Sequence, residues 1–380
     1  MKILHTSDLH IGKRVNEYSM LEEQDFILKQ ITEIAATEQP DAIILAGDIY
    51  DKSIPTAEAV SLFDDFLVGL SKLGKAIFII SGNHDSPERI AFASRIMEAC
   101  KIYLAPVYGG NITPTILKDG DCEVAFYMLP FIKPSIVQHY ADEGAEIKTY
   151  DAAVRYAISK MDIDKKRRNV LITHQFITDA ERSESEDTIV GGLDNIDASA
   201  FDDFDYVALG HLHRPQCCSR ETIRYSGSPL KYSFSEVHDK KSVSIVDIND
   251  DGVHVTEKPL VALHDWHDLR GTYEELTEKS FYDGRPYQED FVRITLTDED
   301  DIPDGMRKLK TIYHKLMDLQ YDNKRTRSGQ TAIGKPMNIE SLKPDQLFAE
   351  LFEKQNAQPM SEDQMQYLNT LIDDIFNNKQ

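Results

Sequence analysis

Residues able to bind metal ions recur in short motifs along this sequence. They are carboxylates, imidazoles and one amide: Asp8, His10, Asp48, Asn83, His84, His174, His211 and His213. Such donors suit manganese, iron, zinc or magnesium, and they differ from a set of thiolates. Two ions bridged by a carboxylate, for which Asp48 is the natural candidate, would activate water and neutralise charge on a phosphoryl group. The motifs therefore predict phosphoester hydrolysis at a dinuclear metal site.

Each motif follows an apolar stretch that has the character of a buried strand. In Asp41-Ala-Ile-Ile-Leu-Ala-Gly-Asp48, a continuous apolar run stops at a glycine, which frees the backbone to turn, and then at an aspartate. Comparable runs precede the other motifs at residues 3–4, 76–80, 169–173 and 206–209. Because α/β sheets bind their ligands beyond the carboxyl ends of the strands, these ends are expected to supply one site.

Helical spacing of apolar residues separates the strands. It predicts helices over residues 21–37, 57–73, 87–100 and 152–161, and hence βαβ units in an α/β fold. Taken alone, an Asp after a glycine is more often a helix cap or a turn residue, and one Asp-x-His pair is a coincidental turn about half the time. The recurrence of such residues after successive strands favours a metal site.

The composition restricts how a polyanion could be bound. The 380 residues carry 65 acidic and 42 basic side chains, a formal net charge of -23. A chain of this length can form two or three domains. A chain this acidic does not offer a generally positive surface to nucleic acids or membranes. A phosphate-containing substrate therefore needs a local positive site, which bound divalent ions would create.

The cysteines and the N-terminus indicate a cytoplasmic protein. Cys100, Cys122 and the pair Cys217-Cys218 show neither CxxC spacing nor the framework of a secreted domain. Polar residues soon follow Ile3-Leu4, and no apolar run approaches a membrane span. We therefore expect reduced thiols, no membrane partner and a cytoplasmic location.

The order of the motifs, D-x-H, G-D-x-x-D, G-N-H-D, T-H and G-H-x-H, resembles that of the calcineurin-like metallophosphoesterases. This resemblance implies a β-sandwich flanked by helices, with two metal positions. One would be held by Asp8, His10, Asp48 and His213. The other would be held by Asp48, Asn83, His174 and His211. His84 would instead donate a proton or hydrogen bond to the transition state, with Asp51 or Asp85 to orient it.

Longer motifs resemble the SbcD family of bacterial nuclease subunits, whose archaeal and eukaryotic counterpart is the double-strand-break repair nuclease. They are His5-Thr-Ser-Asp-Leu-His-Ile-Gly12, Gly82-Asn-His-Asp85, Gly210-His-Leu-His-Arg-Pro-Gln216 and Tyr225-Ser-Gly-Ser-Pro-Leu230. This resemblance implies a nuclease of DNA repair and recombination that uses manganese, with magnesium as the alternative. It would act as an exonuclease on duplex ends and an endonuclease on single strands and hairpins. A phosphatase or cyclic-nucleotide phosphodiesterase, and a non-enzymatic scaffold, are the competing hypotheses.

The same resemblance implies partners. An SMC-like ATPase of the SbcC type would bind C-terminal helices, and two copies of this chain would dimerise through the helices over residues 57–73 and 87–100. The resulting assembly would be a heterotetramer associated with the nucleoid. Apolar stripes over residues 344–354 and 361–378, the second with a capping box at Ser361 and Gln364, suit docking onto such a partner. A polar linker over residues 322–335 favours docking over a return to the chain's own core.

These features divide the chain into a nuclease domain over residues 1–265, a cap domain over 266–335 and docking helices over 336–380. A strand over 291–296 and helical spacing over 306–316 predict an α+β cap, which either grips DNA or only packs beside the site. Gly329-Gln-Thr-Ala-Ile-Gly-Lys335 is similar to a P-loop, but Pro336 replaces the Ser or Thr that reaches magnesium. ATP binding is therefore expected in another subunit.

The remaining basic and histidine residues support weaker hypotheses. Lys13 and Arg14 follow the first motif and are candidates for DNA phosphate contacts or for plain surface residues. The basic run over residues 165–168 is more typical of a solvated face than of a phosphate site. The histidines outside the motifs are expected to be ordinary core or surface residues: His5, His139, His238, His254, His264, His267 and His314.

Overall fold

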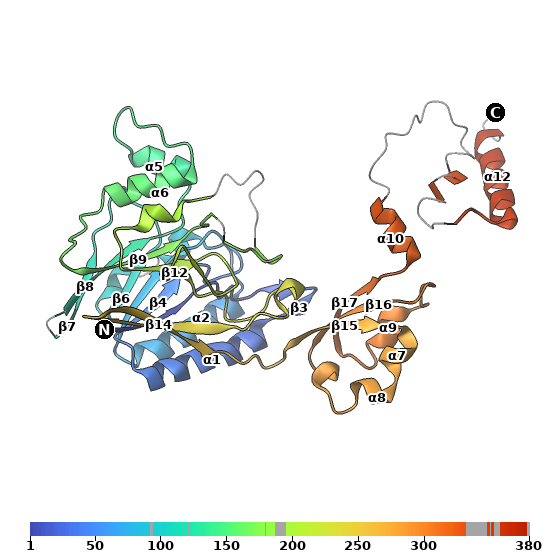
Figure 1. Ribbon diagram of the computed structural model, residues 1–380, viewed down its shortest axis with the longest axis horizontal. Helices are drawn as coiled ribbons and strands as arrows, with labels where there is room; N and C mark the ends of the chain where they lie inside the picture. Colours follow the sequence, from blue (N-terminus) through green and yellow to red (C-terminus); the bar gives the residue numbers. More distant parts are fainter. Residues whose placement is uncertain are drawn as a thin grey trace. The chain divides into compact units, whose positions relative to one another are not determined.

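The chain forms two compact units, Met1–Asp265 and Trp266–Gln380 (Figure 1). A computed structural model describes residues 1–91, 94–120, 122–178, 180–186, 195–331, 348–349, 351–352 and 358–377. No helix within these ranges is long and apolar enough to cross a membrane. The predicted metal-binding motifs all lie in the first unit.

The first sheet of this unit contains six strands. Its order is β14 (Gly252–Pro259), β13 (Ser242–Asn249), β1 (Lys2–Thr6), β4 (Ala42–Ala46), β5 (Ala76–Ile80) and β6 (Ile102–Ala105). β1, β4, β5 and β6 run parallel, and β13 joins β1 in the antiparallel sense. β4 and β5 are buried at every residue, as their continuous apolar runs predict.

The second sheet also contains six strands. Its order is β11 (Gln216–Cys218), β12 (Arg220–Tyr225), β10 (Tyr206–Gly210), β9 (Arg168–His174), β8 (Cys122–Leu129) and β7 (Thr115–Asp119). β8, β9, β10 and β12 run parallel, so their carboxyl ends lie at the same edge.

The two sheets pack face to face, which confirms the predicted β-sandwich. Their shared core takes Ile44 and Phe78 from the first sheet and Phe126 and Ile172 from the second. The rings of Phe78 and Phe126 stack with centroids 4.5 Å apart. Such an aromatic pair adds about 0.5–1.5 kcal/mol beyond the burial of its area. This core fixes one sheet against the other, so strand ends from both sheets can contribute to one site.

Helices cover the outer faces of the sandwich. α1 (Leu21–Glu38) and α2 (Ala57–Ser71) lie on one side, and α5 (Pro134–Tyr140) and α6 (Tyr150–Ser159) lie on the other (Figure 1). Ala153, Val154 and Ala157 of α6 join the core of the second sheet. The short elements of this unit are β2 (Arg14–Val15), β3 (Tyr18–Ser19), α3 (Pro87–Ile90), α4 (Ser94–Glu98), η1 (Ala198–Phe201) and η2 (Phe234–Glu236).

The prediction of one continuous helix over residues 87–100 is wrong. The structure has the short helices α3 and α4, with a turn at Ala91. α4 contains no buried residue, and Ile96 leaves 74% of its surface exposed. Most helical stability in proteins comes from packing of the apolar face, so apolar spacing alone does not maintain a long helix here.

The second unit is built on a parallel sheet of β15 (Trp266–Gly271), β16 (Phe291–Leu296) and β17 (Lys315–Tyr321). Its helical elements include α7 (Tyr273–Thr277), α8 (Lys279–Tyr282), η3 (Pro286–Gln288), α9 (Gly305–Leu309), α10 (Lys324–Thr331) and α12 (Glu362–Asn377). Leu276, Ile294 and Tyr313 lie in its separate apolar core. The Tyr313 hydroxyl donates to Leu276 O over 2.6 Å, which ties α7 to the segment before β17.

Two expectations for this unit are wrong. The helical spacing over residues 306–316 predicts one helix, but α9 ends at Leu309 and Leu316 pairs with Val292 in the sheet. Residues 322–335 are predicted to be a linker, but α10 forms within them. Asn323 caps this helix, because its side-chain oxygen accepts from Thr326 N over 3.1 Å.

The capping box predicted before the last helix is confirmed. Ser361 N donates to Gln364 Oε1 over 2.9 Å, and Gln364 N donates to Ser361 Oγ over 3.3 Å. Of the helix predicted over residues 344–354, the described residues 348–349 and 351–352 are helical. The rest of that segment lies outside the described residues, as do residues 332–335 of the sequence similar to a P-loop.

Candidate metal centre

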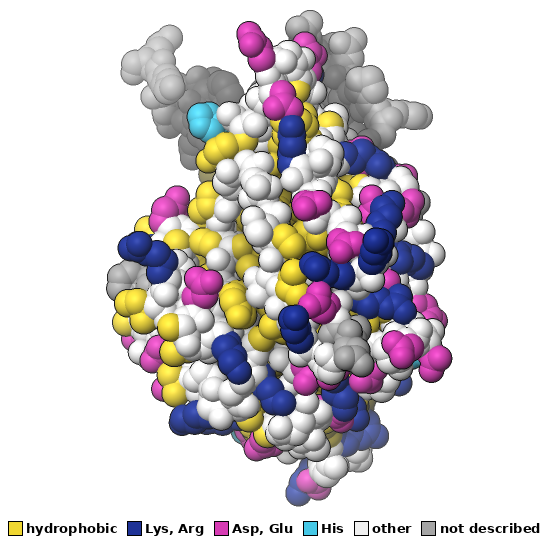
Figure 2. All heavy atoms as spheres, turned by 90° about the vertical axis from the view of Figure 1, so that its left-hand side faces the viewer, with side chains coloured by type: hydrophobic (Ala, Val, Ile, Leu, Met, Phe, Trp, Pro, Cys, Tyr) yellow, Lys and Arg dark blue, Asp and Glu magenta, His cyan; other side chains and the backbone are white. Residues whose placement is uncertain are grey.

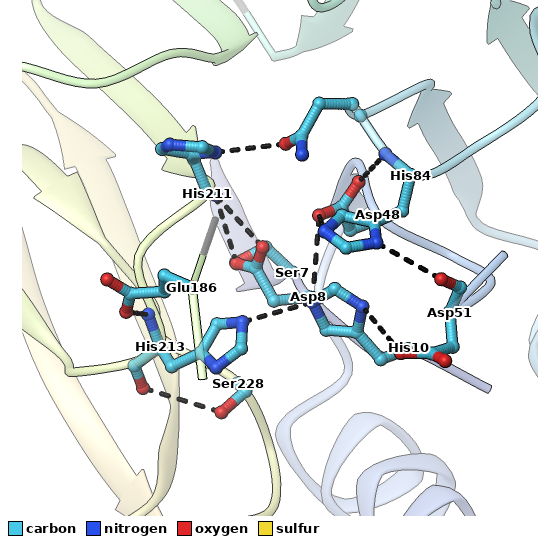
Figure 3. Close-up of polar contacts among 12 residues, drawn as sticks. Ser7, Asp8, His10, Asp48, Asp51, His84, Glu186, His211, His213 and Ser228 are labelled. Atoms are coloured by element: carbon cyan, nitrogen blue, oxygen red, sulfur yellow. Dashed lines mark hydrogen bonds and ion pairs between the residues drawn. The ribbon is translucent and has the colours of Figure 1, made fainter. Parts of the chain in front are cut away.

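The carboxyl ends of strands from both sheets meet at one edge of the sandwich (Figure 3). The motif residues are placed there by the strands that precede them: Asp8 and His10 after β1, Asp48 after β4, Asn83 and His84 after β5, His174 at the end of β9, and His211 and His213 after β10. Within the described residues, three groups of side chains could each hold a metal ion: Asp8, His10 and His213; Asp8, Asp48 and His174; and His10, Asp48 and His84.

The loops hold several of these residues in left-handed backbone conformations. The φ angles of Asp8, His10, Asp48 and His211 are 53°, 44°, 49° and 105°. Residues other than glycine rarely adopt such angles, which concentrate at functional sites. Hydrogen bonds between loops maintain them, because Asp8 N donates to Gly47 O over 3.1 Å and His10 N donates to Asp48 O over 3.0 Å. The backbone therefore directs these side chains toward one another.

Two motif glycines are required by the close approach of the loops. A Cβ atom on Gly82 would collide with the Asp48 carboxylate, and one on Gly210 would collide with the Ala46 carbonyl oxygen. Gly82 lets the loops after β4 and β5 of the first sheet approach, and Gly210 lets the end of β10 in the second sheet approach β4. A ligand contact is not needed to explain either glycine.

The first group of donors lies around His10 and His213. Their Nε2 atoms are 3.0 Å apart, and His10 Nε2 is 3.6 Å from Asp48 Oδ2. Asp8 is fully buried beside them and accepts hydrogen bonds from His211 N over 3.0 and 3.2 Å. Two nitrogens bound to one ion at about 2.1 Å lie roughly 3 Å apart when the bonds meet near a right angle. The spacing therefore fits a shared ion.

The second group of donors lies around Asn83. Its Oδ1 atom is 3.0 Å from His174 Nε2 and 3.0 Å from His211 Nδ1. His174 Nδ1 donates a hydrogen bond to Ala46 O over 2.8 Å. Its Nε2 atom is therefore the one that faces the site and can bind a metal ion.

Asp48 connects the two groups. Its Oδ2 atom lies 3.4 Å from His174 Nε2 and 3.6 Å from His10 Nε2. Its Oδ1 atom accepts from His84 N over 2.9 Å, which fixes the plane of the carboxylate. This is the position that a bridging carboxylate requires.

The pKa values of these groups suit a bound cation. Burial lowers the pKa of His211 to about 3 and lowers that of His10 well below its ordinary value, so both rings are neutral, as metal ligands must be. Burial also disfavours the charged form of His174, but Asp48 and Asp8 raise its pKa to about 9. The carboxylates of Asp48 and Asp8 thus favour a positive charge beside the His174 ring. A divalent ion supplies that charge, so the donor set fits a metal.

His84 lies at the rim of the site, with 19% of its side chain exposed and Nε2 3.9 Å from Asp48 Oδ2. Its Nδ1 atom lies 3.1 Å from the Asp51 carbonyl oxygen, to which it can donate (Figure 3). The Asp51 carboxylate binds Lys13 over 2.8 Å. Asp85 accepts from Gly82 N, Ile49 N and Tyr50 N, and so joins the loops that carry Asn83 and Asp48.

Several buried or half-buried polar residues at this site were not anticipated from the sequence. They are Gln24, Ser185, Glu186, Tyr232, Glu236 and Lys241. Gln24 donates to His10 O over 2.7 Å, and Glu186 accepts from His213 N over 2.6 Å. Burial alone would raise the pKa of Glu236, but the Lys241 ammonium holds it well below its ordinary value. These residues belong to no short motif, and only their burial and hydrogen bonds in the structure identify them.

The basic residues considered as phosphate contacts are mostly engaged by carboxylates. Lys13 binds Asp51, as described above. In the run over residues 165–168, Lys165 lies 2.7 Å from Asp203, Arg167 lies 3.0 Å from Glu123 and Arg168 lies 2.8 Å from Asp205. Figure 2 shows basic and acidic side chains interspersed on the face that it presents. This run is therefore largely neutralised.

Comparison with known proteins agrees with the site. Residues 1–215 match the family model of the calcineurin-like phosphoesterases, and residues 259–356 match that of the type 5 capsule protein repressor C-terminal domain. The SbcD subunit of nuclease SbcCD from Staphylococcus epidermidis is 37% identical over 324 residues, which cover 84% of this chain and 85% of that protein. The SbcD subunit of nuclease SbcCD from Staphylococcus saprophyticus is 33% identical over 317 residues, which cover 82% of each.

Solved structures with some similarity include a dimetal phosphatase from Danio rerio, with a TM-score of 0.41, 10% identity and coverage of 69% of this chain and 98% of that chain.

The fold, the site and the family match define the class as calcineurin-like phosphoesterase, a class of hydrolases. Within that class, the chain belongs to the SbcD family of nuclease subunits. The resemblance stated from the sequence motifs is thereby confirmed.

Proposed function

We propose that this chain is the metal-dependent DNA nuclease subunit of an assembly with an SbcC-type ATPase. It would hydrolyse phosphodiester bonds as an exonuclease at duplex ends and as an endonuclease on single strands and hairpins. Family membership supports this function. The observation that carries it is the buried Asp48 carboxylate, which contacts a donor group on each side.

The metal ligands are proposed as two sets that share Asp48. Asp8, His10, Asp48 and His213 would hold one ion, and Asp48, Asn83, His174 and His211 would hold the other. The donors suit manganese or magnesium, and we propose manganese. When bound, two such ions generate a nucleophile from water and neutralise charge on the phosphoryl oxygens. The chain itself holds the donors in place through the left-handed loops and the interloop hydrogen bonds.

We assign His84 the role of a proton or hydrogen-bond donor to the leaving oxygen. Donation of Nδ1–H to the Asp51 carbonyl would fix the ring and aim Nε2 at the partly exposed rim. Lys13 holds Asp51 in turn, so the basic residue after the first motif supports the catalytic loop. General acid catalysis of this kind contributes about 10²- to 10⁴-fold to a rate.

The test compares two kinds of substrate. Purified chain with manganese is incubated with labelled hairpin DNA and, separately, with a small phosphomonoester and a cyclic nucleotide. Cleavage of the hairpin with slow turnover of the small esters is expected. Turnover of a small ester with intact DNA would favour the phosphatase or cyclic-nucleotide phosphodiesterase instead, and no turnover of any substrate would favour the non-enzymatic scaffold.

Partners follow from the same proposal. Residues 266–335 would be a cap, and residues 336–380 would dock onto the ATPase. On α12, Leu371 is 40% exposed. Two copies of the chain would dimerise through α2 and the segment over residues 87–100, where Val60, Val68 and Ile96 are 45%, 45% and 74% exposed. Light scattering of the isolated chain tests the dimer, and charges placed at Val60 and Val68 should yield a monomer.

A further inference from the structure

A chain of partly buried hydrogen bonds begins at the nitrogen of His213 that faces away from His10. Ser185 Oγ lies 2.6 Å from His213 Nδ1 and 2.5 Å from Glu236 Oε1. A serine hydroxyl has one proton to donate, and an ionised carboxylate can only accept. The hydroxyl therefore donates to Glu236 and accepts from Nδ1–H of His213. With the proton on Nδ1, the lone pair of the ring is on Nε2, the atom that faces His10.

Glu236 is held firmly at the far end of this chain. It is fully buried, and Lys241 Nζ donates to its Oε2 atom over 2.6 Å. Lys241 also donates to the His213 carbonyl oxygen over 2.8 Å and is only 6% exposed. A buried ion pair is often no more stabilising than apolar packing of the same volume. Stability alone therefore gives little reason to bury this pair of charges. Glu236 contacts the His213 ring through Ser185, and Lys241 contacts the His213 carbonyl oxygen directly.

The segment that carries Ser185 is fixed to the same residue. The Glu186 carboxylate accepts from His213 N over 2.6 Å (Figure 3). It also accepts from Ser183 N over 3.0 Å. The ring and the backbone of His213 are thus both bound by residues 183–186. This arrangement restrains the movement of Ser185 that would otherwise break the contact with the ring.

We infer that Ser185 and Glu236 are positioning residues that fix the tautomer and orientation of His213, so that Nε2 is available to the ion shared with Asp8, His10 and Asp48. This inference rests on the proposed metal site. Histidines that bind metals usually donate their other ring N–H to a carboxylate or carbonyl group, and loss of that partner costs about 10- to 100-fold in metal affinity. Here the Ser185 hydroxyl lies between the His213 ring and the Glu236 carboxylate, so the carboxylate orients the ring through this hydroxyl.

The first test uses Ser185→Ala in the full chain, with Ser185→Thr as the conservative variant. Ser233→Ala is the matched control, because Ser233 also donates to Glu236 Oε1, over 2.9 Å, and otherwise contacts Ser235. Calorimetric titration of metal-free protein with manganese is expected to show one position weakened by about 10- to 100-fold in Ser185→Ala, with the other unchanged. Ser185→Thr and Ser233→Ala should bind as the wild type does. Equal binding by Ser185→Ala and Ser233→Ala would overturn the inference.

The second test needs no metal. Nitrogen-15 NMR of histidine-labelled, metal-free protein reports which ring nitrogen of His213 carries the proton, with His213→Asn used for assignment. The wild type and Ser185→Thr are expected to hold the Nδ1–H tautomer, and Ser185→Ala should populate both. A wild-type ring protonated on Nε2 contradicts the inference whatever the metal affinity. Failure of the wild type to bind manganese at all would instead contradict the proposed function and leave the NMR result to decide this inference.

Discussion

The Nε2 atoms of His10 and His213 lie 3.0 Å apart, although the residues are separated by 203 positions in the sequence. His10 follows a strand of the first sheet, and His213 follows a strand of the second. Two nitrogen lone pairs that face each other repel unless a proton or a cation lies between them. The packing of the two sheets therefore creates a place for positive charge that neither sheet contains by itself.

Removal of the Asp48 carboxylate, which the two donor groups share, should cause the loss of bound metal. In Asp48→Ala, both donor groups lose an oxygen ligand, and at least one metal position is expected to be lost together with hydrolysis of DNA. Mass spectrometry of the native protein and elemental analysis count the bound ions. Asp64→Ala, which changes an exposed carboxylate on α2, is the control and should keep both. Two tightly bound ions in Asp48→Ala would show that another residue bridges the site.

The metal donors could be predicted from the sequence because each stands directly after an apolar run. For β5, the predicted and observed bounds are both residues 76–80. Ser185 and Glu186 could not be predicted, because Glu181-Arg-Ser-Glu-Ser-Glu186 has the composition of a solvated loop. Ser185 is fixed by Glu236, which lies 51 positions away. The continuous helix predicted over residues 87–100 is not formed for a physical reason that the sequence does not show, since no residue of α4 is buried against the rest of the chain.

His84 is expected to affect turnover without affecting metal content. In His84→Leu, the proposed proton donor is lost, and hydrolysis of hairpin DNA should fall by about 10²-fold or more. The metal count and the folding should remain near normal, because His84 is assigned to neither ligand set. His139→Leu removes an exposed histidine on α5 and serves as the control. DNA cleavage at the normal rate by His84→Leu would show that the catalytic assignment is incorrect.

Gln24 should stabilise the loop that carries His10. Its side chain is 1% exposed, accepts from Gly12 N over 2.9 Å and donates to His10 O over 2.7 Å. Gln24→Ala leaves Gly12 N without this acceptor and removes one of the two hydrogen bonds to His10 O, the other coming from Lys13 N. The free energy of unfolding of the metal-free chain should therefore fall by about 1–3 kcal/mol. Gln30→Ala, on the exposed side of α1 where Gln30 contacts Val261, should change it far less. Urea unfolding monitored by circular dichroism measures both, and equal losses would contradict this role.

His5 should make the stability of the metal-free chain depend on pH. It is fully buried, with Nδ1 2.8 Å from the Tyr206 hydroxyl, and burial followed by the charge of Arg224 lowers its pKa to about 3 from 6.5. Above pH 6.5 the ring is neutral in both the folded and unfolded states. As the pH falls from about 6.5 toward 3, only the unfolded state binds the proton, so stability is lost at up to about 1.4 kcal/mol per pH unit.

The test for His5 is a comparison with His5→Gln, which removes this proton site. Urea unfolding between about pH 7 and pH 5 should give a smaller loss of stability for the variant than for the wild type. Carboxylates that titrate in this range are common to both proteins and cancel in the difference. Identical pH dependence would mean that His5 is protonated in the folded state.

The last prediction concerns the C-terminal helix as the docking site for the ATPase. With a net charge of -23, the chain has few means of neutralising DNA phosphates, so action on long duplexes needs a partner that binds the DNA. Leu371 lies on α12 and is 40% exposed, which leaves apolar surface for that partner. Combined Leu371→Glu and Ile375→Glu substitutions would bury charges without partners at a cost of several kcal/mol. Co-purification with the ATPase and stimulation by ATP should therefore be lost, while weak, metal-dependent and ATP-independent cleavage of DNA remains. Asn369→Glu, an exposed change on the same helix, is the control. A chain truncated before Leu342 should behave like the double variant; if it still co-purifies with the ATPase at normal yield, the docking site lies elsewhere in the chain.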